Sequence, residues 1–245
     1  MNPSSPQLFA GLTAVSLALV ISSWIGGQSI QQLKNADNTV SVVGAARKAI
    51  KADYGIWEGS VAVERPTLKE AYTALQNDMQ RVRDYLITEQ KLPETAISIQ
   101  ALQSSPISEV LPNGNNSGKI RAYRASQQIE VRLEDVNRIE ALSKDVSSLV
   151  TQDISIESYP PRFLYTKLED LRVEMLSEAT QDARKRAEQI VKSAGSHLGP
   201  VRSVRTGVFQ ITRPHSTEVS DGGMYDTQTI DKEITAVLTM SFAVN

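Results

Sequence analysis

Two histidines are the only imidazoles that could act as a general base or a metal ligand, and neither lies in a catalytic pattern. His197 stands between Gly195 and Gly199 at a predicted helix end, where a histidine most simply caps the last carbonyl groups. His215 lies in a polar loop near Glu218, with a spacing that matches no recognised metal site. We therefore expect no bound metal.

Carboxylate pairs and nucleophile motifs give no better candidate for a catalytic residue. Glu169 and Asp170 are neighbours, but consecutive side chains on a helix diverge by about 100°, so they cannot converge on one bond. There is no cysteine, which excludes thiolate catalysis and disulfides. No serine nucleophile elbow, phosphate-binding loop or dinucleotide-binding glycine motif occurs. We therefore expect a protein that is not an enzyme, with no catalytic residue and no cofactor.

The most basic cluster, Arg184-Lys185-Arg186, does not predict a nucleic-acid interface. Acidic residues interleave with it at helical spacing, which is typical of a solvated face with ion pairs between residues four apart. The whole chain has 26 basic and 28 acidic residues and a net charge of −2. This balance gives no general attraction to nucleic acid.

The cluster belongs to the most informative segment of the chain, from Leu164 to Val201. It follows a Tyr-Pro-Pro bend and ends near a Gly-rich turn, and its apolar residues recur every three or four positions. This spacing predicts a long amphipathic helix, with small side chains that allow close packing on a flat partner. Its predicted buried face is Leu164, Leu168, Leu171, Met175, Ala179, Ala183, Ala187, Ile190 and Ala194.

The remaining soluble part alternates between predicted strands and two shorter helices. Thr67 with Glu70 forms a capping-box pattern before the first helix, and Asp135 is the predicted cap of the second. The element order is β-β-α-β-β-α-β-α-β-β, which predicts an α+β fold with antiparallel sheets and helices packed on one face. The predicted strands are 40–44, 56–64, 97–110, 121–134, 154–165, 201–212 and 234–244.

Two strand regions have loops at their tips, Ser104–Arg121 and Thr206–Ile230. An open strand edge invites pairing with another chain. The two interpretations are an edge that the protein itself covers or charges, and an edge that forms a subunit contact.

The stretch from Leu8 to Ile25 is 18 residues long without a charge, close to the length that spans a bilayer. We predict an uncleaved membrane anchor, with a cleaved signal peptide as the alternative, since the first seven residues carry no basic side chain. A buried core helix is a third interpretation. The residues predicted to contact lipid are Leu8, Phe9, Leu12, Val15, Leu17, Leu19, Val20, Ile21, Trp24 and Ile25.

The predicted organisation is a membrane or signal segment at 1–27, a polar tether at 28–38 and one α+β domain at 39–245. Lys34 follows the apolar stretch, so the positive-inside rule alone would place the domain in the cytoplasm. Charge alone therefore does not determine on which side of the membrane the domain lies.

In this order the elements resemble the SIMPL domain family, which includes periplasmic proteins of the YggE type and periplasmic immunogenic proteins. The resemblance covers about Thr39 to Val244. It is carried by Val40-Ser-Val-Val-Gly44, the Trp57–Val63 strand, Tyr123–Val131, the Ala179–Glu188 helix block and Gly195–Val201. It implies an extracytoplasmic protein that forms oligomers and is linked to envelope or oxidative stress. The family provides no catalytic residues.

The first functional hypothesis is therefore a non-enzymatic SIMPL protein that self-assembles in the bacterial envelope. We expect it to be held at the inner membrane with its domain extracytoplasmic, or to be periplasmic if the N-terminal segment is cleaved. The alternative is an envelope binding module that carries a small hydrophobic ligand or a partner protein between its helices and its sheet.

Overall fold

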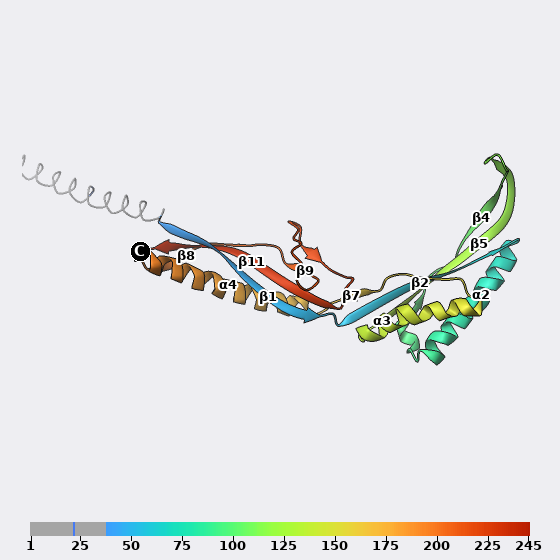
Figure 1. Cartoon of the computed structure of the whole chain (residues 1–245), viewed down its shortest axis with the longest axis horizontal. Coiled ribbons are helices and arrows are strands. Elements are labelled where there is room, and N and C mark those ends of the chain that lie inside the picture. The colour runs from blue at the N-terminus through green and yellow to red at the C-terminus, as the bar shows by residue number, and fades with distance from the viewer. Residues whose placement is uncertain (1–21, 23–37) are drawn as a thin grey trace, which may run out of the picture. The chain divides into compact units, whose positions relative to one another are not determined.

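The computed structural model of the protein describes Ser22 and residues 38–245, and it is a mixed α+β structure (Figure 1). The α-helices are α2 (Leu68–Asp84), α3 (Val136–Asp145) and α4 (Leu168–Ser193), with a π-helical turn at Tyr85–Glu89 and 3₁₀ turns at Glu94–Ala96 and Val146–Gln152. The strands are β1 (Thr39–Lys51), β2 (Tyr54–Arg65), β3 (Ile97–Ile99), β4 (Gln103–Val110), β5 (Asn116–Leu133), β6 (Ile156–Ser158), β7 (Arg162–Leu164), β8 (Leu198–Thr206), β9 (Gln210–Thr212), β10 (Met224–Tyr225) and β11 (Asp231–Val244).

These elements form two sheets and divide into two compact units. One sheet has the order β1-β11-β9-β10, with β8 also paired to β11, and the other has the order β3-β5-β2-β6, with β4 on β5 and β7 on β2. Of the described residues, the first unit contains Ser22, 38–47, 172–209 and 235–245, and the second contains 48–171 and 210–234. Both units lie within the single domain that the sequence predicts at 39–245, apart from Ser22 and residue 38.

The second unit is organised by the antiparallel pair of β2 and β5. The two strands stay in register from Gly55 opposite Leu133 to Arg65 opposite Tyr123. From Trp57 to Val63 the buried residues of β2 alternate with partly exposed ones, as expected for a sheet with one covered face. The predicted inward face of Trp57, Gly59, Val61 and Val63 is buried.

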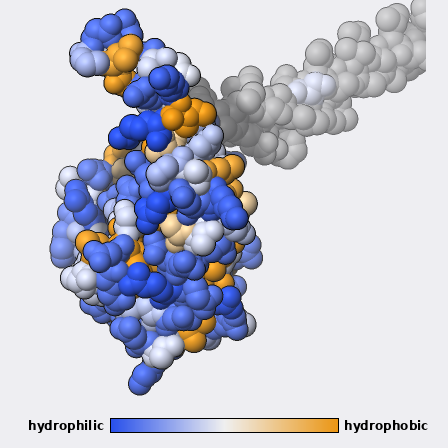
Figure 2. Space-filling model, turned by 90° about the vertical axis from the view of Figure 1, so that its right-hand side faces the viewer, coloured by the Kyte–Doolittle hydropathy of each residue, from blue (hydrophilic) through white to orange (hydrophobic). Residues whose placement is uncertain are grey.

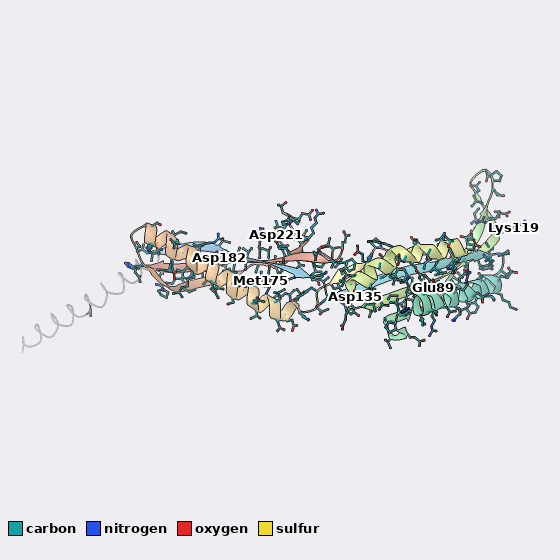
Figure 3. All side chains as sticks on the ribbon, turned by 60° about the horizontal axis from the view of Figure 1, so that its bottom comes forward. Glu89, Lys119, Asp135, Met175, Asp182 and Asp221 are labelled. Carbon is teal, nitrogen blue, oxygen red and sulfur yellow. The ribbon has the colours of Figure 1, made fainter. Side chains whose placement is uncertain are left out.

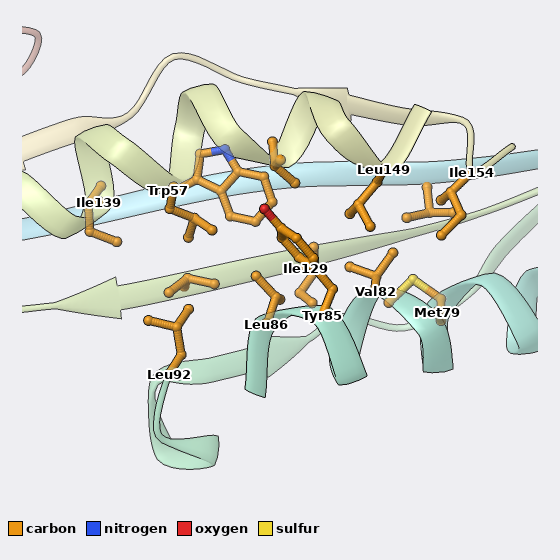
Figure 4. Packing of buried hydrophobic residues seen from close by; sticks show 14 of the residues in the cluster. Trp57, Met79, Val82, Tyr85, Leu86, Leu92, Ile129, Ile139, Leu149 and Ile154 are labelled. Carbon is orange, nitrogen blue, oxygen red and sulfur yellow. The ribbon is translucent and has the colours of Figure 1, made fainter. Parts of the chain in front are cut away.

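Helices α2 and α3 both cover this face, and their apolar residues meet in one core (Figure 4). Trp57 lies at its centre, fully buried, and its indole N–H donates to Ser158 Oγ over 2.9 Å. Gly59 leaves the space that the indole ring occupies, because a Cβ there would lie 2.7 Å from the ring. The core therefore depends on one large residue and one residue without a side chain, two positions apart on the same strand.

The two predicted helix caps are confirmed. Thr67 Oγ1 accepts the backbone N–H of Glu70, and the Glu70 carboxylate accepts the backbone N–H of Thr67, which completes the capping box of α2. Asp135 accepts the backbone N–H groups of Asn137 and Arg138 at the start of α3. Both helices thus begin where local sequence chemistry places them.

In the first unit, α4 lies along the sheet at β1 (Figure 1). Contact is closest at Gly44, where a Cβ would overlap the carbonyl oxygen of Ala179 and lie 2.6 Å from the Ala183 methyl carbon. Ala179, Ala183 and Ala187 have no exposed surface, and Met240 and Phe242 of β11 are buried in the same unit. Small residues on both partners allow this approach.

The buried line on α4 differs from the predicted one at its ends. Leu164 belongs to β7, Leu168 is half-buried and Ala194 is exposed. Ile190, predicted on the buried face, is 51% exposed, so that prediction is wrong. The buried residues are Leu171, Met175, Ala179, Ala183, Ala187 and Val191.

A strict four-residue step explains the exposure of Ile190. Four residues turn an α-helix by about 400°, so each step moves the contact line about 40° around the axis. Such a winding line suits a sheet whose strands twist. At the last turn the line has reached Val191 and has left Ile190 on the flank of the helix.

Three of the predicted strands are each divided into two shorter strands in the structure. The predicted strand 154–165 is broken into β6 and β7 around Pro160-Pro161, because proline has no N–H for a central ladder. The predicted strand 97–110 becomes β3 and β4, which pair with different parts of β5. The predicted strand 201–212 becomes β8 and β9, and β10 is an additional short strand that pairs with β9 in parallel.

The predicted membrane segment, Leu8 to Ile25, lies outside the described residues apart from Ser22. Within the described part of the chain, no helix combines the length and the apolar character needed to cross a bilayer.

Replacing Gly44 with alanine is expected to lower the free energy of unfolding by about 2 kcal/mol, because the added methyl group overlaps the backbone of α4. Urea unfolding followed by circular dichroism measures the change. Gly222→Ala is the matched control, since a Cβ there meets only the Ser220 hydroxyl at 4.0 Å. Equal midpoints for the two variants would contradict the close approach of α4 to β1.

Candidate functional site

The residues first considered for chemistry do not come together in the described structure. Gly195, with φ of +75°, and the Ser196 N–H, which donates to Val191 O over 2.9 Å, close the end of α4. The backbone of His197 exchanges hydrogen bonds with that of Asn245. No group of three or more His, Asp or Glu residues in the described part could hold a metal ion.

The charged face of α4 forms the ion pairs that its spacing predicts. Arg184 Nε lies 2.9 Å from Glu188 Oε1, and Arg186 Nε lies 2.8 Å from Asp182 Oδ2, both at a separation of four residues. Arg184 and Arg186 are therefore partnered by acidic residues of their own helix.

Asp182 has a second partner that the sequence analysis did not identify. Its Oδ2 accepts the backbone N–H of Ala45 in β1 over 2.9 Å. This hydrogen bond and the one from Arg186 lower the pKa of the Asp182 carboxyl below its usual value. The signal in the sequence was the pattern of small residues: Gly44 beside Ala45, and Ala179 and Ala183 around Asp182.

The face of the second unit's sheet that is turned away from Trp57 carries paired charges. Glu58 and Glu130 lie directly opposite each other on β2 and β5, where two carboxylates would repel. Arg162 is in an ion pair with Glu58, and Arg132 is in an ion pair with Glu130. Each carboxylate is therefore neutralised by its own arginine, which is the arrangement of a structural network rather than of an acid and base pair.

Lys232, at the start of β11, is a fully buried lysine that the sequence analysis also missed. Its ammonium group donates to the carbonyl oxygens of Asp226 (2.6 Å) and Thr229 (2.5 Å), and it lies 3.5 Å from Asp226 Oδ2. Burial lowers the pKa of Lys232, and the charge of Asp226 opposes this shift. Burial alone would raise the pKa of Asp226, but hydrogen bonds from Thr229 and Gln228 and the Lys232 charge together lower it.

This buried pair secures the loop before β11. The Asp226 N–H donates to Ile211 O over 2.8 Å, and the carbonyl of Thr227 accepts the N–H of Phe163 over 2.7 Å. Of the two regions predicted to have open edges, the part from Gln210 to Ile230 is thus held by bonds within its own unit.

The other region, Ser104–Arg121, contains an unsupported two-stranded ribbon. We use this name for residues 107–122, the part of β4 and β5 that lies beyond the end of β2 at Arg65. There β5 pairs only with β4, and nearly every residue of β4 is exposed. In Figure 2 the ribbon forms the projection at the top, and Figure 3 labels Lys119 on it.

The ribbon carries large apolar side chains into solvent. Val110 is 65% exposed, Ile120 is 52% exposed and Leu111 is 41% exposed. The turn between the strands is well hydrogen-bonded, with the Leu111 N–H donating to Asn115 O over 2.8 Å. An isolated two-stranded ribbon is only marginally stable in water. This apolar ribbon is the strongest candidate docking element among the described residues.

The grooves lined by described residues are a poorer candidate for a hydrophobic ligand. One, of about 760 Å³, is open to solvent at the start of α2, and its lining includes Arg65, Lys69, Glu70 and Asn77. Between α2, α3 and the sheet, the space is occupied by the core side chains (Figure 4).

Lys232→Met is expected to lower the free energy of unfolding by about 3 kcal/mol, because it leaves the Asp226 carboxylate partly buried without its cation. The double variant Lys232→Met/Asp226→Asn should regain part of this loss, since it also removes the unpaired charge. Urea unfolding of the single and double variants measures both effects. A single variant as stable as the natural protein would show that the pair does not hold the loop.

The model of the SIMPL family, described as a protein of unknown function (DUF541), matches residues 40–242. The match includes residues of both compact units. A search of curated proteins finds no match. The chain belongs to the SIMPL family, as the resemblance in its sequence indicates.

Proposed function

We propose that this protein is a non-enzymatic component of the bacterial envelope that assembles with further copies of itself through the ribbon. The N-terminal apolar segment holds it at the inner membrane with its SIMPL domain outside the cytoplasm, or releases it into the periplasm if the segment is cleaved. A link to envelope or oxidative stress belongs to the same proposal and rests on the family resemblance alone.

The observation that carries the proposal is the exposure of Val110, Leu111 and Ile120 on a ribbon in which, among the described residues, β5 pairs only with β4. A folded protein gains free energy by removing such side chains from water, at roughly 25 cal/mol per Å² of apolar surface. Strand edges and apolar tips are the features that chains use to pair with copies of themselves. Attachment to a membrane would also raise the local concentration of the copies.

The alternative is a binding module for a small hydrophobic ligand. The described groove at α2 is open and has a mixed lining that includes charged side chains, and the core between the helices and the sheet is packed, so neither is an enclosed apolar site. A partner protein at the ribbon is the second alternative, and the following experiment separates it from self-assembly.

The full-length protein in detergent should form species larger than a monomer, measured by light scattering with the detergent mass subtracted. Changing Val110 and Ile120 to aspartate should raise the dissociation constant at least ~100-fold. Two apolar side chains contribute about 3 kcal/mol when buried, and 1.4 kcal/mol corresponds to a factor of ten.

Val219→Asp is the matched control, because Val219 is 79% exposed but lies outside the ribbon. It should assemble as the natural protein does. A natural protein that stays monomeric at every concentration would contradict self-assembly. Equal assembly of all three proteins would show that the ribbon is not the contact surface.

The proposed location predicts that protease added to intact spheroplasts degrades the SIMPL domain while cytoplasmic proteins survive. The N-terminal apolar segment is the motivation, since an anchor of this length places a domain on one side of the bilayer. Protection until the spheroplasts are lysed would place the domain in the cytoplasm, as the position of Lys34 alone suggests.

A further inference from the structure

Strand β1 ends the order of its sheet, so one of its sides has no neighbouring strand in the described structure. The carbonyl of Asn38 accepts from Val244, and the N–H of Ala52 donates to Ile230, so even-numbered residues turn toward β11. In an antiparallel ladder, alternate residues point their backbone groups to opposite sides. The N–H of Ala45 therefore points to the free edge.

That N–H donates a hydrogen bond to a side chain of the same protein. Asp182 reaches from α4 to accept it over 2.9 Å, and Arg186 holds the carboxylate with its Nε at 2.8 Å (Figure 3 labels Asp182). The reach is short because Gly44, next to Ala45, lets α4 approach β1 without an intervening side chain. A carboxylate thus stands at the middle of an edge that another strand would otherwise use.

The sequence of β1 is compatible with antiparallel pairing to a second copy of itself. A two-fold axis at Ala45 would place Arg47 opposite Val43 and Lys51 opposite Thr39 of the other copy. Like charges would then not face each other along the two strands. The element that opposes this pairing is Asp182, because two carboxylates, one from each copy, would occupy the centre of the new ladder.

We propose that Asp182 caps the free edge of β1 and excludes β1 of a second copy from it. Charged groups on edge strands are a known means of preventing uncontrolled pairing. Here the charge comes from the covering helix rather than from the strand, so the block operates only while α4 is seated on Gly44. This inference concerns an edge separate from the ribbon and does not depend on it.

A single cysteine can report on this edge because the natural chain has none. In an Ala45→Cys protein, directly opposed residues of two β1 strands would be close enough for a disulfide. Adding Asp182→Ala should increase the fraction of disulfide-linked dimer at least ~5-fold over the Ala45→Cys protein alone. The ribbon substitutions Val110→Asp and Ile120→Asp are included throughout, so that ribbon contacts do not contribute.

Two controls separate loss of the cap from other effects of the substitution. Asp182→Asn keeps an oxygen that can accept the Ala45 N–H and should restrict the dimer as aspartate does. Arg186→Ala removes the ion pair but leaves the hydrogen bond to Ala45, and it should also stay close to the natural level.

Hydrogen exchange at the amide of residue 45, in proteins that retain alanine there, gives a second readout. The amide should be protected with aspartate or asparagine at 182. In the alanine variant it should exchange rapidly when dilute and regain protection as concentration rises. Absence of added dimer in the alanine variant would overturn the proposal. Equal cross-linking from a cysteine at Val219 would also overturn it, because that pattern indicates general unfolding.

Discussion

The close contact between Gly44 of β1 and the small residues Ala179 and Ala183 of α4 is the constraint on which the first unit depends. A helix can approach a strand this closely only where neither partner carries a bulky side chain. The contact buries the alanine line and sets the position of α4 along the strand. It also brings Asp182 within hydrogen-bonding distance of the β1 backbone, so one packing event produces both the core and the capped edge.

In the second unit, different residues allow the helices to pack closely on the sheet. Its core is built around Trp57, for which Gly59 provides space, and two capped helices cover one face of the sheet. The opposite face carries carboxylates that are each neutralised by an arginine. On the ribbon, by contrast, Val110, Leu111 and Ile120 are exposed to solvent, and this exposed apolar surface is the reason for assigning the contact role to it.

Features determined by local chemistry could be predicted from the sequence. The caps at Thr67 and Asp135 depend on residues only two or three positions away, and the inward face of β2 follows from alternation. Ile190 could not be placed, because the twist of the sheet decides which residue of the last helical turn is buried. The division of the predicted strands was missed for a similar reason, since it depends on which partner strand each segment meets.

The candidate site was only partly predictable. The sequence indicated two regions with open edges, but it did not show which of them is held within its own unit and which is exposed. The distinction depends on where β2 ends and on the buried pair of Lys232 and Asp226, which holds the other region. The bond from Ala45 to Asp182 joins residues that lie 137 positions apart, so no local pattern reveals it.

The contact between β1 and α4 can be measured directly by nuclear Overhauser effects in protein labelled at its alanine methyl groups. Strong cross-peaks between the α protons of Gly44 and the methyl groups of Ala179 and Ala183, together with shielding of these methyls from a soluble paramagnetic agent, are the predicted result. Absent cross-peaks and methyl signals broadened by the agent would contradict the account, because α4 would then not be seated on the sheet.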